Sequence, residues 1–193
     1  FSEMARRAGI AVDCDVARGV AERRRKDDRE IACLRDAQRV TETVVERACR
    51  RIAASPARAD GILVLDGAPL TSERARALVQ HWLLDLDFSP APPIVAGGPV
   101  GADCHDEGHG ALRAGEPVIV DILPRSNRTR YHGDCTRTVV NGDIPAEVAR
   151  MHAAVRDAKA AAVAALRPGV TGETVHAATT QAIRRNGYAV GLP

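Results

Sequence analysis

The sequence predicts an α+β fold in which an antiparallel sheet packs against helices. Two segments rich in β-branched residues, 117–122 and 131–140, are joined by a polar loop at 126–129, which is typical of an antiparallel hairpin. Between residues 27 and 54, apolar side chains recur every three or four positions, which indicates a long helix with one apolar face. Because 45% of its 193 residues are hydrophobic, the chain is able to bury a core.

The segments on either side of this long helix predict shorter elements. Residues 1–9 have a helical pattern that stops at Gly9, and the run Ile10-Ala-Val that follows favours a strand. After the long helix, the apolar residues 62–65 predict a short strand. We therefore expect a small helix and a strand before the long helix, and another strand after it.

Further helices are expected on both sides of the hairpin. Thr71 or Ser72, followed by an acidic residue, predicts the N-cap of a second helix. Residues 94–98 predict a strand that ends in glycines, which allow the backbone to lie close to a site. Two helices are predicted at 145–166 and 171–187. The first of them has an apolar face formed by Val148, Met151, Val155, Ala158 and Ala162.

Charge and cysteine usage argue against several classes of partner. The formal net charge is +2, and the basic run 23–26 is followed directly by Asp27 and Asp28, which favours a solvated helix face over a nucleic-acid site. The five cysteines are odd in number and form no Cys-x-x-Cys pair, which is typical of a reducing compartment. No apolar run approaches the roughly 20 residues that cross a bilayer, and no signal peptide is recognised, so we expect a cytoplasmic protein. We also expect that the chain, from Phe1 to Pro193, is cut at both ends.

The loop at 101–110 contains two histidines, His105 and His109, at the spacing of a helical zinc site. Gly101, Gly108 and Gly110 argue against a helix here, and the sequence does not match His-Glu-x-x-His. A zinc site of that type is therefore disfavoured, and the segment is expected to be a loop.

The hairpin carries one aspartate on each strand. Asp121 lies inside an apolar run, where an ionised carboxylate is costly without a cation or several donors. Asp134 repeats this pattern on the second strand, and an antiparallel hairpin brings both to one end of the sheet on the same face. A divalent metal ion between them relieves their repulsion. The alternative is a structural ion pair that ties the hairpin together, Asp121 with Arg137 or Asp134 with Arg130.

The hairpin resembles the metal-binding hairpin of the pita-bread metallopeptidases. The similarity rests on Val-Asp-Ile-Leu-Pro-Arg at 120–125 and on Gly-Asp-Cys-Thr-Arg-Thr-Val-Val-Asn-Gly at 133–142. The Pro-Arg pair favours the Xaa-Pro aminopeptidase and Xaa-Pro dipeptidase branch. Shorter similarities follow along the chain, at 26–32, 70–74, 95–98 and 167–172.

The resemblance implies a domain plan. It implies a pita-bread fold, incomplete in this chain, with an antiparallel sheet covered by helices that include 145–166 and 171–187. Residues 1–24 are then the remnant of a smaller α/β N-terminal domain. Residues 25–193 form the N-terminal part of the catalytic domain.

The resemblance also implies a site that holds two divalent metal ions, Mn, Co, Zn or Fe(II). Asp121 matches the aspartate that binds one ion, and Asp134 matches the aspartate that bridges both. His105 matches a histidine that contacts substrate and shuttles a proton, although a loop histidine without a role is the alternative. Thr136 and Arg137 are expected to orient the carboxylate of Asp134.

The implied activity is hydrolysis of a peptide bond near the N-terminus of a peptide, of the Xaa-Pro type, by a metal-activated hydroxide. The family's remaining ligands, one histidine and two glutamates, are expected beyond Gly187, so we expect the fragment alone to be inactive. Homodimers are usual in this family. The alternatives are a non-catalytic member that binds peptides or proteins, and creatinase-like hydrolysis without metal. The presence of both aspartates argues against these two alternatives, because neither needs them as metal ligands.

Overall fold

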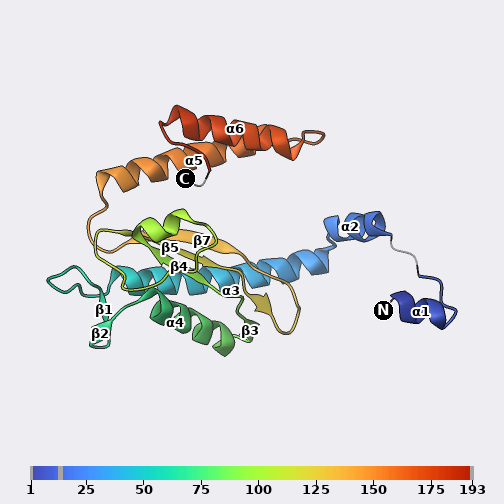
Figure 1. Cartoon of the computed structure of the whole chain (residues 1–193), viewed down its shortest axis with the longest axis horizontal. Helices are drawn as coiled ribbons and strands as arrows, with labels where there is room; N and C mark the ends of the chain where they lie inside the picture. The colour runs from blue at the N-terminus through green and yellow to red at the C-terminus, as the bar shows by residue number, and fades with distance from the viewer. Residues whose placement is uncertain (1, 13–14, 192–193) are drawn as a thin grey trace.

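The computed structural model describes residues 2–12 and 15–191, so Phe1, Cys14 and Pro193 lie outside the described ranges (Figure 1). The helices are α1 (Ser2–Arg7), α2 (Val16–Arg24), α3 (Asp28–Ala53), α4 (Ser72–Asp85), α5 (Ala146–Ala165) and α6 (Gly172–Arg185). The strands are β1 (Val64–Leu65), β2 (Ala68–Pro69), β3 (Phe88–Ser89), β4 (Ile94–Gly97), β5 (Pro117–Ile122), β6 (Arg125–Ser126) and β7 (Cys135–Val140), and a 3-10 turn η1 (Gly98–Ala102) follows β4.

An antiparallel sheet in the order β4-β5-β7 forms the centre of the molecule, and α3 and α4 pack on one of its faces (Figure 1). Along β5 the burial alternates, so that Val118, Val120 and Ile122 point into the core between sheet and helices. Ile119 and Asp121 therefore lie on the opposite face. The predicted α+β fold with an antiparallel hairpin is confirmed.

The long helix α3 has the predicted extent and the predicted buried stripe. It begins with a capping box, in which the Asp27 carboxylate accepts the Glu30 N–H and the Glu30 carboxylate accepts the Asp27 N–H. At its other end, the buried side-chain nitrogen of Asn141 lies 2.9 Å from the carbonyl oxygens of Ile52, Ala53 and Ser55. These bonds fasten the end of β7 to α3, because they give a further donor to carbonyl groups at the end of the helix, where regular intrahelical partners run out.

The N-terminal segment differs from the prediction. Residues 10–12 are described and form no strand, whereas the helix α2, which the sequence pattern did not indicate, occupies 16–24. No helix within the described ranges is both long and apolar enough to cross a membrane.

The second strand of the hairpin is shorter than predicted, since β7 begins at Cys135 and not at Tyr131. A tight turn precedes it: the Ser126 N–H donates to the Tyr131 carbonyl, and Arg130 adopts a φ of 68°. Ser126 also pairs with Phe88 in the β3–β6 ladder, which draws this part of the loop away from β5.

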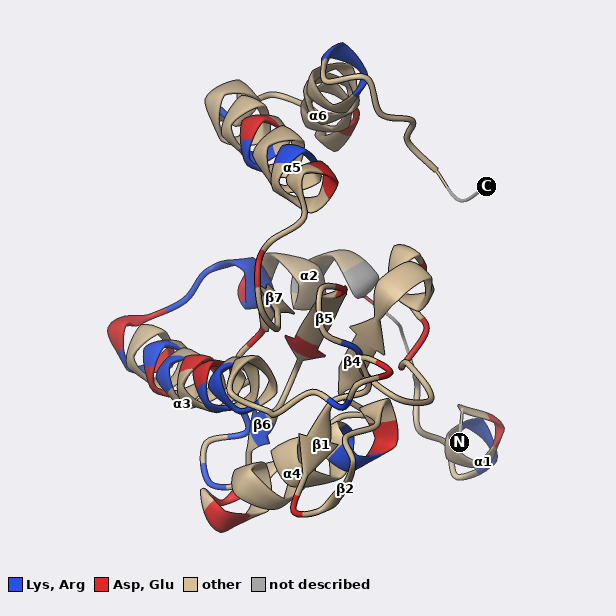
Figure 2. Ribbon diagram, turned by 90° about the vertical axis from the view of Figure 1, so that its left-hand side faces the viewer, with Lys and Arg blue, Asp and Glu red and all other residues tan. Residues whose placement is uncertain are grey.

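The C-terminal helices α5 and α6 pack against each other and add little cover to the central sheet in the described part of the chain (Figure 2). This differs from the expected arrangement. On the predicted apolar face of α5, Ala158 is buried, but Met151 is 48% and Val155 is 59% exposed. The difference arises because α6 covers one side of α5 and the described chain places no second layer on the other.

Candidate metal centre

The strand register places the two aspartates on one face of the sheet. Asp121 in β5 is paired with Thr136 in β7. Asp134 lies two residues before Thr136, and residues two apart in an extended chain point to the same side. This side is opposite to α3 and α4. The pKa of the nearby Cys135 thiol is raised, chiefly by burial, and the negative charges of Asp134 and Asp121 add to the effect.

Asp121 is half-buried and accepts a hydrogen bond of 2.7 Å at Oδ1 from the Thr136 hydroxyl. Within the described ranges, neither Asp121 nor Asp134 forms an ion pair with an arginine, lysine or histidine. The alternative of structural pairs with Arg137 and Arg130 is therefore wrong. The carboxylates remain open to a cation.

Asp134 is positioned by α3. Its backbone N–H donates to the side-chain oxygen of Gln38 at 3.0 Å, and the Gln38 amide nitrogen donates to Glu42 at 3.0 Å, which fixes the direction of the amide group. The preceding Gly133 lies against α3 so closely that an added Cβ would be 2.1 Å from the Thr41 hydroxyl. Gln38 and Gly133 were not predicted as site residues.

Thr136 and Arg137 do not orient Asp134 in the predicted way. The Thr136 hydroxyl contacts Asp121 instead. Arg137 follows Thr136 in the strand and points to the other face, where it lines a hollow of about 400 Å³ between α3 and β7 together with Glu42 and Cys49. Its guanidinium donates to the Thr136 carbonyl at 2.8 Å.

His105 lies in an exposed loop after η1, and the contacts described for it are within that loop. Its N–H donates to Oδ1 of Asp103 at 2.9 Å, and its Nδ1 lies 3.7 Å from Sγ of Cys104. The expected loop is confirmed, because no helix extends over residues 103–110. His109 contacts Asp106 at 3.9 Å and is not paired with His105.

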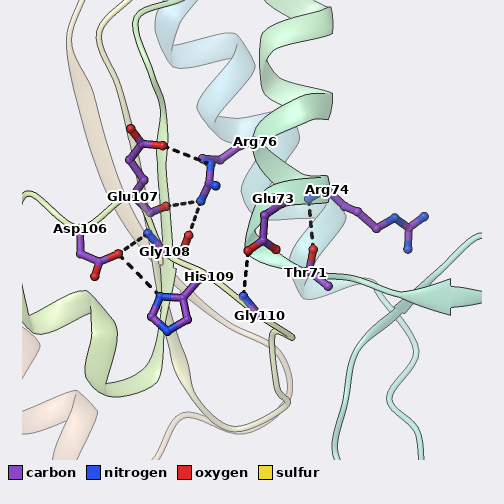
Figure 3. Close-up of polar contacts among 9 residues, drawn as sticks. All are labelled: Thr71, Glu73, Arg74, Arg76, Asp106, Glu107, Gly108, His109 and Gly110. Atoms are coloured by element: carbon purple, nitrogen blue, oxygen red, sulfur yellow. Dashed lines mark hydrogen bonds and ion pairs between the residues drawn. The ribbon is translucent and has the colours of Figure 1, made fainter.

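The helix α4 holds the second half of this loop (Figure 3). The Arg76 guanidinium donates to the carbonyls of Glu107, at 2.6 Å, and of Gly108, and it lies 3.8 Å from the Glu107 carboxylate. The Glu73 carboxylate accepts the N–H of Gly110 at 3.1 Å. An added Cβ on Gly108 would lie 2.0 Å from the Val95 carbonyl oxygen, so the loop is pressed against β4.

Hydrogen bonds at the start of α4 also change the acidity of Glu73. The Thr71 side chain caps the helix, as predicted, by accepting the Arg74 N–H at 3.3 Å. The Thr71 hydroxyl lowers the pKa of Glu73 the most, and the backbone N–H groups of Glu73 and Gly110 lower it further, to about 2. These donors favour the charged carboxylate, which keeps the bond to the loop in place.

Fold and site together define a pita-bread α+β protein with two open carboxylates on the uncovered face of its sheet. Comparison with known proteins specifies the family: the profile of metallopeptidase family M24 matches residues 32–192. The chain belongs to this family.

Several relatives can be compared over most of the chain. The probable dipeptidase PepE of Mycobacterium bovis is 33% identical over 181 residues, which cover 86% of this chain and 44% of that protein. The crystal structure of dipeptidase PepE from Mycobacterium ulcerans matches with a TM-score of 0.68 and 29% identity, over 84% of this chain and 40% of that one. The prolidase from Pyrococcus horikoshii has the same fold, with a TM-score of 0.76 and 21% identity, over 97% of this chain and 50% of that one. The chain spans less than half the length of the curated dipeptidases it matches.

Proposed function

We propose that the protein to which this chain belongs is a metal-dependent peptidase that hydrolyses a peptide bond near the N-terminus of its substrate, of the Xaa-Pro type. The observation that carries the proposal is the placement of Asp121 and Asp134. They share a face of the sheet, and no cationic side chain of the described residues neutralises either of them. Membership of a metallopeptidase family supports the same activity.

The donor set fits a hard or borderline divalent cation. One oxygen of Asp121 accepts from Thr136, its second oxygen has no hydrogen-bond donor among the described residues, and Asp134 is exposed. Carboxylate oxygens with a single imidazole suit Mn, Fe(II), Co or Zn ions. In the proposal Asp121 would help to hold one ion and Asp134 would help to hold both, and later segments of the protein would supply a histidine and two glutamates. When bound, such ions polarise the scissile carbonyl and activate a water molecule.

The other residues act by position and by proton transfer. Thr136 fixes the rotation of the Asp121 carboxylate, and Gln38 fixes the backbone at Asp134. His105 contacts the substrate and moves a proton, since histidine side chains accept and release protons near neutral pH. The bonds from α4 to residues 107–110 limit the movement of the loop that carries it.

The proposal extends to domain plan and environment. Residues 1–24 are the end of an N-terminal domain, and 25–193 begin the catalytic domain of a homodimer. The free cysteines among the described residues support a reducing, cytoplasmic compartment; they are Cys33, Cys49, Cys104 and Cys135.

The test is a hydrolysis assay on the product of the complete reading frame, with Ala-Pro as substrate and Mn, Co, Zn or Fe(II) added in turn. We expect turnover with at least one metal, its loss in Asp121→Asn, and a lower kcat in His105→Ala. Gly-Leu, which lacks proline, is the control for specificity, and the 193-residue chain alone is expected to show little activity.

Absence of hydrolysis with all four metals would contradict the proposal and favour a non-catalytic peptide-binding module. Equal turnover of Ala-Pro and Gly-Leu would contradict the Xaa-Pro preference but keep the peptidase.

A further inference from the structure

Three consecutive residues of the exposed loop after η1 carry different metal-ligating atoms that lie close together. A carboxylate oxygen of Asp103, Sγ of Cys104 and a ring nitrogen of His105 all lie within 4.8 Å of one another. Among the described residues, no other group of three or more His, Cys, Asp or Glu side chains has its ligand atoms this close together. The group includes neither Asp121 nor Asp134.

The distance between the two softer ligands matches chelation of one ion. Cys104 Sγ and His105 Nδ1 are 3.7 Å apart. Bonds of about 2.3 Å from zinc to sulfur and about 2.05 Å from zinc to nitrogen, at a tetrahedral angle, separate the two ligand atoms by about 3.6 Å. The pair therefore needs little movement to bind a tetrahedral ion.

The turn is fixed before any ion binds. Oδ1 of Asp103 accepts the His105 N–H at 2.9 Å, and a carboxylate keeps a second oxygen with open lone pairs. Further along, Arg76 and Glu73 hold residues 107–110. The three ligand atoms thus lie within 4.8 Å of one another on a turn whose continuation is bonded to α4.

The charge of the loop also favours a cation. Residues 101–110 contain Asp103, Asp106 and Glu107 and no lysine or arginine. Of these carboxylates, Glu107 faces the Arg76 guanidinium at 3.8 Å. The Asp103 carboxylate remains beside the thiol and the imidazole.

We propose that Asp103, Cys104 and His105 form a binding site for a thiophilic divalent cation of the zinc class. Binding releases the thiol proton to solvent, because the thiolate is the ligand, and leaves the fourth coordination position to water. Manganese prefers oxygen ligands and competes poorly here. The consequence, which rests on the proposed function, is that an ion at this site withdraws the His105 imidazole from the substrate and inhibits the peptidase.

Cobalt(II) is the probe for the site, because a cobalt–thiolate bond produces a charge-transfer absorption band that carboxylate ligands do not give. The 193-residue chain is titrated with cobalt, and zinc is then added. We expect a band that zinc removes and that is absent in Cys104→Ser. In His105→Ala we expect cobalt to bind at least tenfold more weakly. Cys33→Ser is the matched control and is expected to keep the band.

A band that survives in Cys104→Ser, or no band in the unsubstituted chain, would overturn the site. The same titration on the double variant Asp121→Asn, Asp134→Asn separates this inference from the proposed function, since the band is expected to remain there. Loss of the band in the double variant would show that the thiolate site is not independent and would overturn the proposal.

The inhibitory consequence is measured on the complete protein with manganese present. Zinc is expected to inhibit hydrolysis, and Cys104→Ser is expected to raise the half-inhibiting zinc concentration at least tenfold. Equal inhibition of both proteins would overturn the consequence. If the complete protein has no peptidase activity, the proposed function and this consequence fail together, whereas the cobalt titration still decides the site.

Discussion

The hydroxyl of Thr136 donates a 2.7 Å hydrogen bond to Oδ1 of Asp121 across the β5–β7 ladder. The bond fixes the carboxylate of Asp121 on the face that it shares with Asp134. A metal-binding role for this pair depends on that orientation, because groups that orient a ligand carboxylate are worth about 10- to 100-fold in metal affinity or activity.

Thr136→Val keeps the shape and β-propensity of the side chain and removes the hydroxyl. We expect manganese affinity to fall by about tenfold, with little change in stability because Thr136 is exposed. Isothermal titration with manganese measures the affinity. Thr138→Val, two residues further along the same face, is the control. Equal affinities of the two variants would contradict the role of the Thr136 hydroxyl.

Gly133→Ala tests the contact that positions Asp134 on α3. The new Cβ would lie 2.1 Å from the Thr41 hydroxyl and 2.6 Å from the Ala37 carbonyl oxygen. Because overpacking typically costs about 1–3 kcal/mol, we expect a loss of that size in the free energy of unfolding, measured in urea. Gly172→Ala, where nothing lies within 4 Å, is expected to be neutral or slightly stabilising. Similar stabilities for both variants would show that the Gly133 backbone is not held against α3.

Arg76→Met tests the attachment of the His105 loop to α4. The Arg76 side chain is 17% exposed and donates to two loop carbonyls. Since hydrogen bonds from charged groups contribute about 1.5–3 kcal/mol, we expect a loss of about 2 kcal/mol and faster amide exchange in residues 101–110. Arg50→Met removes an exposed pair with Glu46 and is expected to cost less than about 1 kcal/mol. Unchanged exchange in the loop would contradict its attachment by Arg76.

Glu73 makes stability depend on pH. Its pKa is lowered from 4.5 to about 2 in the folded chain. A lowered pKa means that the contribution to stability is complete above the unfolded value of about 4.5 and is lost as pH falls towards about 2. The Tm deficit of Glu73→Gln relative to the unsubstituted chain should therefore shrink over that range. Glu46→Gln is the control for loss of one surface carboxylate, and a deficit of Glu73→Gln that does not change with pH would contradict the account.

The sequence patterns that predicted structure well were those with a strong local period. The stripe of α3 reported which face of the helix is buried, and the β-branched run of β5 reported a strand; the structure confirms the stripe and the strand. The paired aspartates were visible for the same reason, since a carboxylate interrupts an apolar run. The helix α2 was missed because its apolar period is weak beside the basic run at 23–26.

Contacts between distant residues left no local pattern. Gln38 is 96 positions from Asp134, and an ordinary glutamine on a helix face does not indicate its partner. The sequence placed Arg137 beside Asp134 but did not give the register that decides towards which face its side chain points. Once Asp121 is paired with Thr136, the alternation of the strand places Arg137 towards α3.

The most direct measurement is a titration of the 193-residue chain with manganese, in which the paramagnetic signal of free manganese reports how much of the metal is bound. The account predicts that Asp121→Asn and Asp134→Asn each weaken binding by at least about tenfold, which corresponds to about 1.4 kcal/mol. Asp143→Asn, which removes an exposed carboxylate just after β7, should bind manganese like the unsubstituted chain. If all three variants bind manganese equally, Asp121 and Asp134 do not form a metal centre and the central claim is wrong.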